Sequence, residues 1–214
     1  FALADIADGV IGGFQPDFDG EITKVEFLTT DPATTGGKSS VLHLTVAGQN
    51  LGTNEKVTLT EGGSGLTSFT PTFGGQTTAS LDDDATAAQV QAALEALSTI
   101  GAGNILVTDG PLGSGPFMLE FVGDLGGTNV GGVTTTPTGG TGSVTPAVDT
   151  AGLTTTLSLT TVACNAEGNI VASANAFTTA NATFSAGDEI GVVAASTTAF
   201  TQGRGVVRIT VAAA

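Results

Sequence analysis

Apolar and polar residues alternate along most of this chain, and glycine-rich turns interrupt the alternation. In residues 39–47, Val41 and Thr45 fall on one side of an extended chain and Leu42 and Leu44 fall on the other. Alternation over such short runs predicts half-buried β-strands. The same pattern predicts strands at residues 20–30, 57–60, 66–73, 76–81, 104–108, 117–122, 153–163, 169–174, 189–195 and 205–211. Short strands separated by turn residues are typical of a β-sandwich or barrel.

One alanine-rich segment, residues 84–97, departs from the alternation and predicts a helix. Its apolar positions recur at helical spacing and fall on one face: Val90, Ala93, Leu94 and Leu97. Asp84 is the expected N-cap, and Asp82 and Asp83 add negative charge where the helix dipole favours it. Gly101 provides the expected stop signal. A helix among so many strands indicates a second, different module inside the β domain.

Neither end of the chain contains a complete set of strands by itself. Two good strands precede residue 50 and about four follow residue 147, and together they suffice for a sandwich of ordinary strand number. We therefore expect a mainly β fold, an antiparallel β-sandwich of jelly-roll type into which a small α+β domain with one helix is inserted.

The expected domain boundaries follow from these strands. Residues 21–53 and 147–214 are expected to form the outer sandwich, and residues 54–146 the inserted domain. Within the insertion, residues 126–146 are rich in glycine, threonine and proline and are expected to be an exit linker with one strand. Residues 1–20 fit neither a clean helix nor a clean strand, and we interpret them as an extended arm that packs on its own or a neighbour's surface.

The charge of the chain excludes several classes of partner. Twenty acidic and five basic residues give a net charge of −15, whereas nucleic-acid binding requires a basic footprint. The same charge disfavours an anionic membrane, and no apolar run approaches the roughly 20 residues of a membrane-spanning helix. An acidic surface keeps crowded copies soluble. It is also suited to a basic partner or to divalent cations.

Two acidic groups are candidates for cation binding. The run Asp82, Asp83 and Asp84 precedes the expected helix, so helix capping and dipole compensation explain it better than a metal site does. Asp17 and Asp19, near Glu21, have the hard oxygen ligands that calcium prefers, but their spacing matches no calcium loop. A solvated turn is the favoured interpretation, so no metal site is predicted.

No set of residues in the sequence supports catalysis or cofactor binding. His43 is the single histidine and Cys164 the single cysteine, so neither a triad nor a zinc site is predicted around them. His43 is expected to be a structural residue or a subunit contact, and Cys164 a small buried hydrophobe. Arg204 and Arg208 are expected either to pair with carboxylates across an interface or to be exposed surface charges. We therefore predict a protein that is not an enzyme.

One part of the sequence resembles a known module. The similar segments are residues 57–60, 69–78, 85–97, 100–108 and 117–121, which together combine strands with the helix. This pattern resembles a small module that recurs in tailed-phage virion proteins and in large repetitive bacterial surface proteins. The resemblance covers about residues 54–135 and implies no single function.

A second part resembles phage head-fibre or capsid-decoration proteins. The similarity lies in residues 181–192, 196–200 and 203–209, together with the strand at residues 22–27 and the turn at residues 34–38. The resemblance implies a β-sandwich on the outside of the capsid, often in a symmetric oligomer. The inserted domain is a departure from the simpler pattern.

These resemblances imply a function as a virion structural protein. The expected role is decoration of the outer capsid surface of a tailed phage, with the major capsid protein and further copies of the chain, in a trimer, as partners. A host surface glycan is a further candidate ligand. The alternatives are a receptor- or glycan-binding module of a tail or fibre, and a domain of a bacterial surface protein. Against glycan binding, the chain contains neither Trp nor Tyr for stacking on sugar rings.

Overall fold

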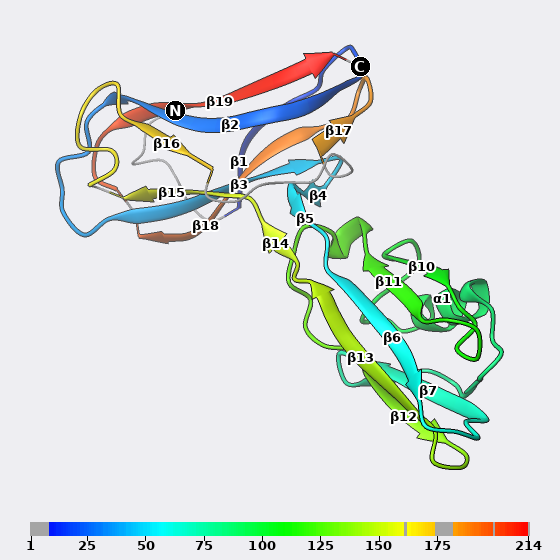
Figure 1. Ribbon diagram of the computed structural model, residues 1–214. Coiled ribbons are helices and arrows are strands. Elements are labelled where there is room, and N and C mark those ends of the chain that lie inside the picture. Colours follow the sequence, from blue (N-terminus) through cyan, green and yellow to red (C-terminus); the bar gives the residue numbers. More distant parts are fainter. Residues whose placement is uncertain (1–8, 161, 174–181, 199, 214) are drawn as a thin grey trace. The chain divides into compact units, whose positions relative to one another are not determined.

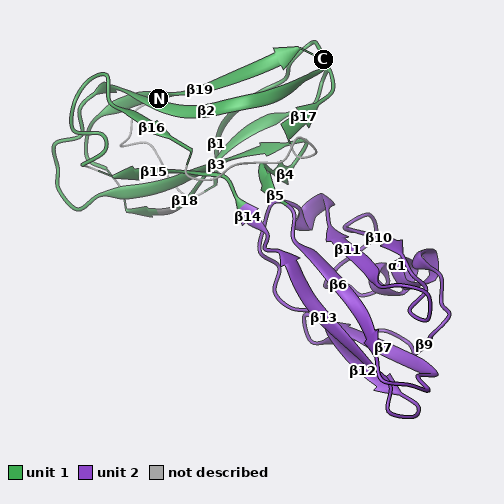
Figure 2. Ribbon diagram, in the orientation of Figure 1, with its two compact units in different colours: residues 1–53, 154–214 green, residues 54–153 purple. Residues whose placement is uncertain are grey.

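The computed structural model describes residues 9–160, 162–173, 182–198 and 200–213 (Figure 1). The fold is mainly β, sandwich-like and built from antiparallel sheets, with one α-helix in the described part. The chain divides into two compact units (Figure 2). Unit 1 comprises residues 1–53 and 154–214, and unit 2 comprises residues 54–153.

Unit 1 contains two antiparallel sheets. The strands of the first sheet are, in spatial order, β1 (Gly9–Phe14), β18 (Ile190–Thr198), β3 (Ser39–Val46) and β15 (Thr156–Thr160), with β4 (Gln49–Asn50) also paired to β3. In the second sheet the long strand β2 (Gly20–Asp31) is central. It pairs with β19 (Arg204–Ala213), β16 (Ile170–Ala172) and β17 (Thr183–Phe184).

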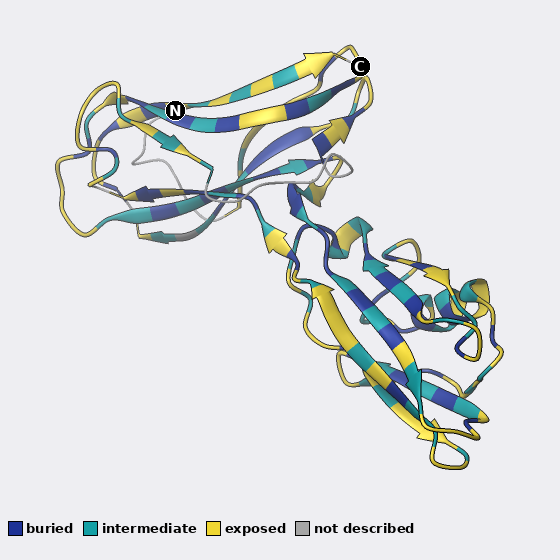
Figure 3. Ribbon diagram, in the orientation of Figure 1, coloured by how far each residue is buried: buried dark blue, intermediate teal, exposed yellow. Residues whose placement is uncertain are grey.

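The core of unit 1 lies between these two sheets, as the alternation of the sequence predicts. Phe27 and Val25 of β2 and Leu42 and Leu44 of β3 belong to one buried cluster. Because side chains on a strand alternate between its faces, β3 buries every second residue and leaves the residues between them partly exposed (Figure 3). Burial of apolar surface at about 25 cal/mol per Å² provides most of the stabilisation.

Unit 2 also contains two antiparallel sheets. The first consists of β10 (Ile105–Asp109), β11 (Phe117–Phe121), β6 (Lys56–Gly62) and β13 (Ser143–Thr150) in spatial order. The second consists of β12 (Thr134–Thr138), β7 (Ser68–Phe73) and β8 (Gln76–Thr77), with β9 (Leu81–Asp82) paired to β7. The short strands β5 (Gly52–Thr53) and β14 (Leu153–Thr154) pair where the chain passes between the units.

The core of unit 2 is rich in phenylalanine. Phe69 and Phe117 lie with ring centroids 6.2 Å apart, and Phe73 and Phe121 are stacked at 5.1 Å. All four rings are buried in the same cluster, which also contains apolar residues of the helix. Aromatic pairs of this kind contribute beyond the area that they bury.

The helix of unit 2, α1 (Ala87–Glu95), begins later than the sequence predicts. The N-cap is Thr86, not Asp84. The Thr86 hydroxyl accepts a hydrogen bond from the backbone N–H of Gln89, and the Gln89 side chain accepts one from the backbone N–H of Thr86 at 2.8 Å. This capping box satisfies two helix-end donors and explains why Thr86 rather than Asp84 is the cap.

The C-terminal end of α1 lies two residues before the predicted one. The helix ends at Glu95, so Leu97 lies just beyond it, although Leu97 is buried with Val90 and Leu94. Gly101 has a φ of +79° and its N–H donates to the carbonyl of Leu97 at 2.8 Å. A positive φ there suits glycine, which terminates the segment as its position in the sequence suggests.

The inserted unit extends further along the chain than expected. Residues 147–153, assigned to the sandwich by sequence, group with unit 2 because β13 continues to Thr150 along β6. Residues 126–146, expected to be a linker with one strand, contain β12 and the first half of β13. Threonine- and proline-rich segments of this kind conceal strands because their apolar side chains are few.

The segment expected to be an N-terminal arm contains a strand of unit 1. Residues 9–14 form β1, which pairs antiparallel with β18 from Gly9 to Phe14. Gly12 and Gly13 interrupt the alternation of apolar side chains, which hides the strand from a pattern search. The expectation for residues 1–8 lies outside the described residues.

Candidate functional site

The acidic residues near the N-terminal strand are not gathered into a metal site. Oδ1 of Asp19 accepts a hydrogen bond from the backbone N–H of Ala186 at 2.8 Å, and Glu21 lies in β2 opposite Thr183. Asp17 is exposed. Among the described residues, no group of three or more His, Cys, Asp or Glu side chains is placed to hold a metal ion. Asp19 therefore joins two turns of unit 1.

The acidic run before the helix is divided between two local structures. Asp82 ends β9, opposite Ser68 of β7, while Asp83 and Asp84 lie in the turn that leads to Thr86. The first turn of α1 contains no acidic residue. The run therefore does not provide the cap that the sequence suggests.

His43 lies in the middle of β3. Across the sheet it faces Val193 of β18 and Thr156 of β15. Its side chain is half-buried, and this burial lowers the pKa of the imidazole below its ordinary value of 6.5. The residue is therefore neutral at neutral pH and belongs to the surface of a sheet.

Cys164 lies in the core of unit 1 and is unsuited to nucleophilic chemistry. The residue is completely buried, and its carbonyl accepts a hydrogen bond from the N–H of Ala33 at 2.8 Å. Burial raises the pKa of the thiol, with a smaller opposing effect from hydrogen bonds to Thr29 and Thr160. Since the thiolate is the reactive form, this cysteine is inert.

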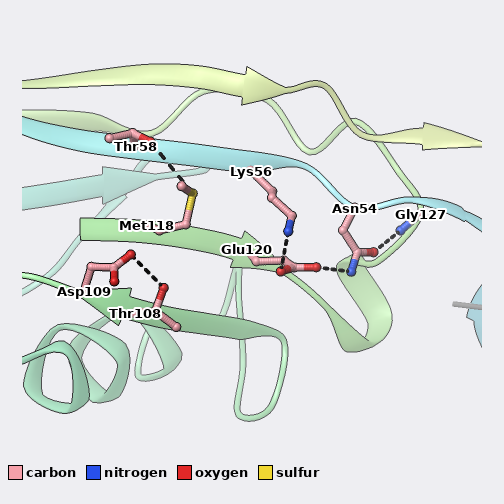
Figure 4. Close-up of polar contacts among 8 residues, drawn as sticks. All are labelled: Asn54, Lys56, Thr58, Thr108, Asp109, Met118, Glu120 and Gly127. Carbon is pink, nitrogen blue, oxygen red and sulfur yellow. Dashed lines mark hydrogen bonds and ion pairs between the residues drawn. The ribbon is translucent and has the colours of Figure 1, made fainter. Parts of the chain in front are cut away.

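A polar network that the sequence did not reveal lies at the start of β6 (Figure 4). The Glu120 carboxylate accepts a hydrogen bond from Nδ2 of Asn54 at 2.9 Å and pairs with Nζ of Lys56 at 3.0 Å. Oδ1 of Asn54 in turn accepts a hydrogen bond from the N–H of Gly127 at 3.0 Å. The network joins β6, β11 and the loop after β11 within unit 2.

Glu55 belongs to the same region and is almost completely buried, with 1% of its surface exposed. Its Oε2 accepts a hydrogen bond from the N–H of Val130 at 3.1 Å, and its carbonyl accepts one from the N–H of Phe121 at 2.9 Å. Its Oε1 is buried without a hydrogen-bond partner in the described part of the chain. Glu55 therefore holds the loop before β12 in place.

Sequence reasoning missed this network because its partners are far apart in the chain. Asn54 marks the expected start of the inserted domain, and nothing in the sequence joins it to Glu120 or Gly127. The available signal was the pair Asn54 and Glu55, two polar residues directly before an apolar strand. Buried polar groups require such partners, so polar residues at a strand entry suggest a loop that packs over it.

The most distinctive surface of unit 1 is an apolar groove between the edges of its two sheets. The groove has a volume of about 360 Å³ and lies between β1 and β18 of one sheet and β19 of the other. Two glycines of β1 and six apolar side chains form its walls: Ile11, Phe14, Val192, Val206, Val207 and Ile209. Among the described residues, the lining contains no charged, nucleophilic or metal-binding side chain, and such apolar walls are suited to docking.

A second apolar surface of unit 1 crosses the outer face of the sheet that contains β16, β2 and β19. Leu28 of β2 lies opposite Ile170 of β16 on one side and opposite Val206 of β19 on the other. Ile170 is 52% exposed and Val206 is 41% exposed. Directly opposed residues of antiparallel strands share a face, so the three side chains form one row. We call this row the outer apolar row.

Arg204 and Arg208 both lie on β19, beside these two surfaces. Both are exposed, and Arg208 is opposite Glu26 in β2. Within the described residues, the ion pairs are Lys24 with Glu26 at 2.6 Å and Lys56 with Glu120, so neither arginine is paired. The structure therefore leaves open the interface role that the sequence allowed for these residues.

Comparison with known proteins identifies no relative, because no protein-family model and no curated protein matches the chain. Within the described part of the chain, no helix has the length and apolar character needed to cross a membrane.

Proposed function

We propose that this protein is a non-enzymatic structural protein of a tailed-phage virion that decorates the exterior of the capsid. In this proposal unit 1 binds the major capsid protein and associates with other copies of the chain, as a trimer, and unit 2 is displayed outward. The phage assignment comes from the sequence resemblances. The capsid-binding role of unit 1 rests on its exposed apolar surface.

The observation that carries the proposal is the outer apolar row of unit 1. Ile170, Leu28 and Val206 occupy one row across three strands of a sheet whose opposite face covers the core. Isolated exposed apolar residues are ordinary, but a contiguous row on a flat face favours contact with another protein. The next row contains Ala172, Glu26 and Arg208 and gives the face a polar margin.

The charge of the chain is compatible with this role. A net charge of −15 limits uncontrolled association where many copies are displayed on one particle. The two units also differ in charge, because each contains ten acidic residues, but unit 2 contains one basic residue and unit 1 contains the other four. Unit 1 is thus the better candidate for the contact with the capsid.

A binding assay with capsids that lack this protein tests the proposal. The purified chain is mixed with such capsids, and the bound copies are measured after sedimentation. Ile170→Asp is expected to weaken binding at least about ten-fold, because burial of an isoleucine contributes about 1.5–3 kcal/mol. Val148→Asp is the matched control, since Val148 is a similarly exposed valine, at 54%, on β13 of unit 2.

Three results would contradict the proposal: no binding of the wild-type chain to capsids, binding to tails alone, or equal losses from the two substitutions. A glycan-array signal from a chain that does not bind capsids would support the attachment role instead. Circular dichroism of both variants establishes that the substitutions leave the fold intact.

A further inference from the structure

We propose that the open edge of unit 1 is the contact between copies of this chain, with β19 of one copy lying beside β1 of the next. This inference rests on the homo-oligomer that is part of the proposed function, and it identifies the surface that forms it. The occupant of the apolar groove between β1 and β19 is thus a second copy.

Both β1 and β19 lie at sheet edges in the described part of the chain. β19 pairs with β2, and β1 pairs with β18, with no further neighbour among the described strands (Figure 1). β19 is ten residues long and rich in β-branched residues. Edge strands expose backbone donors and acceptors, so a long and regular edge favours pairing with another chain.

The groove between these edges carries no charge on the walls that the structure describes. Its walls are apolar or glycine, while the chain as a whole has a net charge of −15. Two copies repel each other wherever acidic surfaces meet, and an uncharged strip avoids this cost. Val10 is 71% exposed and Phe14 is 46% exposed on the β1 edge, which adds apolar surface to the strip.

The β19 edge is basic, whereas acidic groups lie beside the β1 edge. β19 contains Arg204 and Arg208 and no acidic residue. An acidic group lies beside the apolar β1 edge, because Glu189, which directly precedes β18, places its Oε1 3.3 Å from the position that a Cβ at Gly13 would occupy. Asp17 follows this edge and is exposed. A β19 edge of one copy therefore complements a β1 edge of another.

These charges also decide which edges meet. Antiparallel pairing of β19 with β19 of a second copy would bring arginines toward arginines, and like charges directly opposite are destabilising. Pairing of β19 with β1 brings Arg208 toward Glu189 instead. The contact joins two different edges, so it is heterologous, and it forms a closed ring where the rotation between successive copies closes.

Substitution of Gly12 provides a probe that leaves the monomer intact. A Cβ at Gly12 meets no atom within 4 Å, yet Gly12 lines the groove, so Gly12→Glu places a charge there without a clash. Gly132→Glu is the matched control, because a Cβ at Gly132 in unit 2 also meets nothing within 4 Å. The readout is the mass of the full chain by analytical ultracentrifugation over a range of concentrations.

We expect the wild-type chain and Gly132→Glu to form the same oligomer, and Gly12→Glu to raise its dissociation constant at least about ten-fold. Arg208→Glu and Glu189→Lys are each expected to weaken assembly. The double variant with both substitutions restores opposite charges at every contact, whatever the number of copies in the ring. Its dissociation constant should return to within about three-fold of the wild-type value.

A monomeric wild-type chain, an oligomer unaffected by Gly12→Glu, or a double variant as weak as the single ones would overturn the proposal. Capsid binding by the same variants separates this inference from the proposed function. A wild-type chain that binds capsids as a monomer would leave decoration standing while rejecting the edge contact. An oligomer that survives Gly12→Glu would likewise assign the contact to another surface.

Discussion

Unit 1 and unit 2 use their apolar residues differently. Unit 2 places four phenylalanines in two ring pairs inside its core, and its buried Glu55 fastens a loop over β6. Unit 1 instead leaves an apolar groove at its open edge and an exposed apolar row on its outer sheet. The difference suggests that unit 2 is stabilised within itself, whereas unit 1 retains apolar surface for binding.

The largest expected effect tests whether each unit has its own core. Phe117→Ala in unit 2 removes a completely buried ring and should cost about 3–5 kcal/mol. Differential scanning calorimetry should then show a lower melting temperature for one transition while self-association persists. Phe27→Ala, at an equally buried ring of unit 1, should lower the other transition and abolish assembly. A single transition that falls equally in both variants would show that the units unfold together.

A smaller effect is expected at the buried carboxylate of unit 2. Glu55→Ala leaves the N–H of Val130 without its acceptor and should destabilise unit 2 by about 1–3 kcal/mol in urea unfolding. Glu55→Gln retains an acceptor oxygen and should lose less. Glu61→Ala in β6 is the control and should have little effect, since the Glu61 side chain makes no hydrogen bond or ion pair among the described residues. Equal losses of stability from Glu55→Ala and Glu61→Ala would show that Glu55 does not hold the loop before β12 in place.

The capping box of α1 gives a further comparison within unit 2. Thr86→Ala removes the cap and should cost about 1 kcal/mol in the urea unfolding of unit 2. Asp84→Ala should change the same free energy much less, because Asp84 is exposed and outside the helix. A larger loss of stability from Asp84→Ala than from Thr86→Ala would instead identify Asp84 as the N-cap.

The smallest expected effect is a pH dependence confined to unit 1. Burial lowers the pKa of His43, so below pH 6.5 the unfolded chain binds a proton that the folded chain resists binding. The stability of unit 1 should therefore be complete above pH 6.5 and should fall as the pH drops below it. Unit 2 contains no histidine, so its stability should change less between pH 7.5 and 5.5. A His43→Gln variant with the same pH dependence as the wild type would refute this origin.

The parts of the fold that the sequence predicted are those with strict alternation. The pattern of residues 39–47 corresponds to β3, with Leu42 and Leu44 in the core and Val41 and Thr45 on the outer face. β1 was missed because its glycines carry no side chain to mark a face. The extent of unit 2 was underestimated because the exposed threonines and prolines of β12 and β13 resemble a linker.

The candidate surfaces were less predictable than the strands. Sequence reasoning singled out Arg204 and Arg208, but the groove beside them depends on β1 and β19 lying near each other, although nearly 200 residues separate them in the chain. The outer apolar row likewise depends on the register of three strands. The network of Asn54 and Glu120 is equally long-range. Contacts of this kind follow from topology, which local pattern does not determine.

In the proposed function, unit 1 binds the outer surface of a capsid. A cryo-EM reconstruction of the virus particle tests it most directly, with the chain located by α1 of unit 2. The account predicts density on the outer capsid face in which the sheet of β16, β2 and β19 contacts the major capsid protein. Density on a tail appendage, or capsid contact through unit 2 alone, would contradict it.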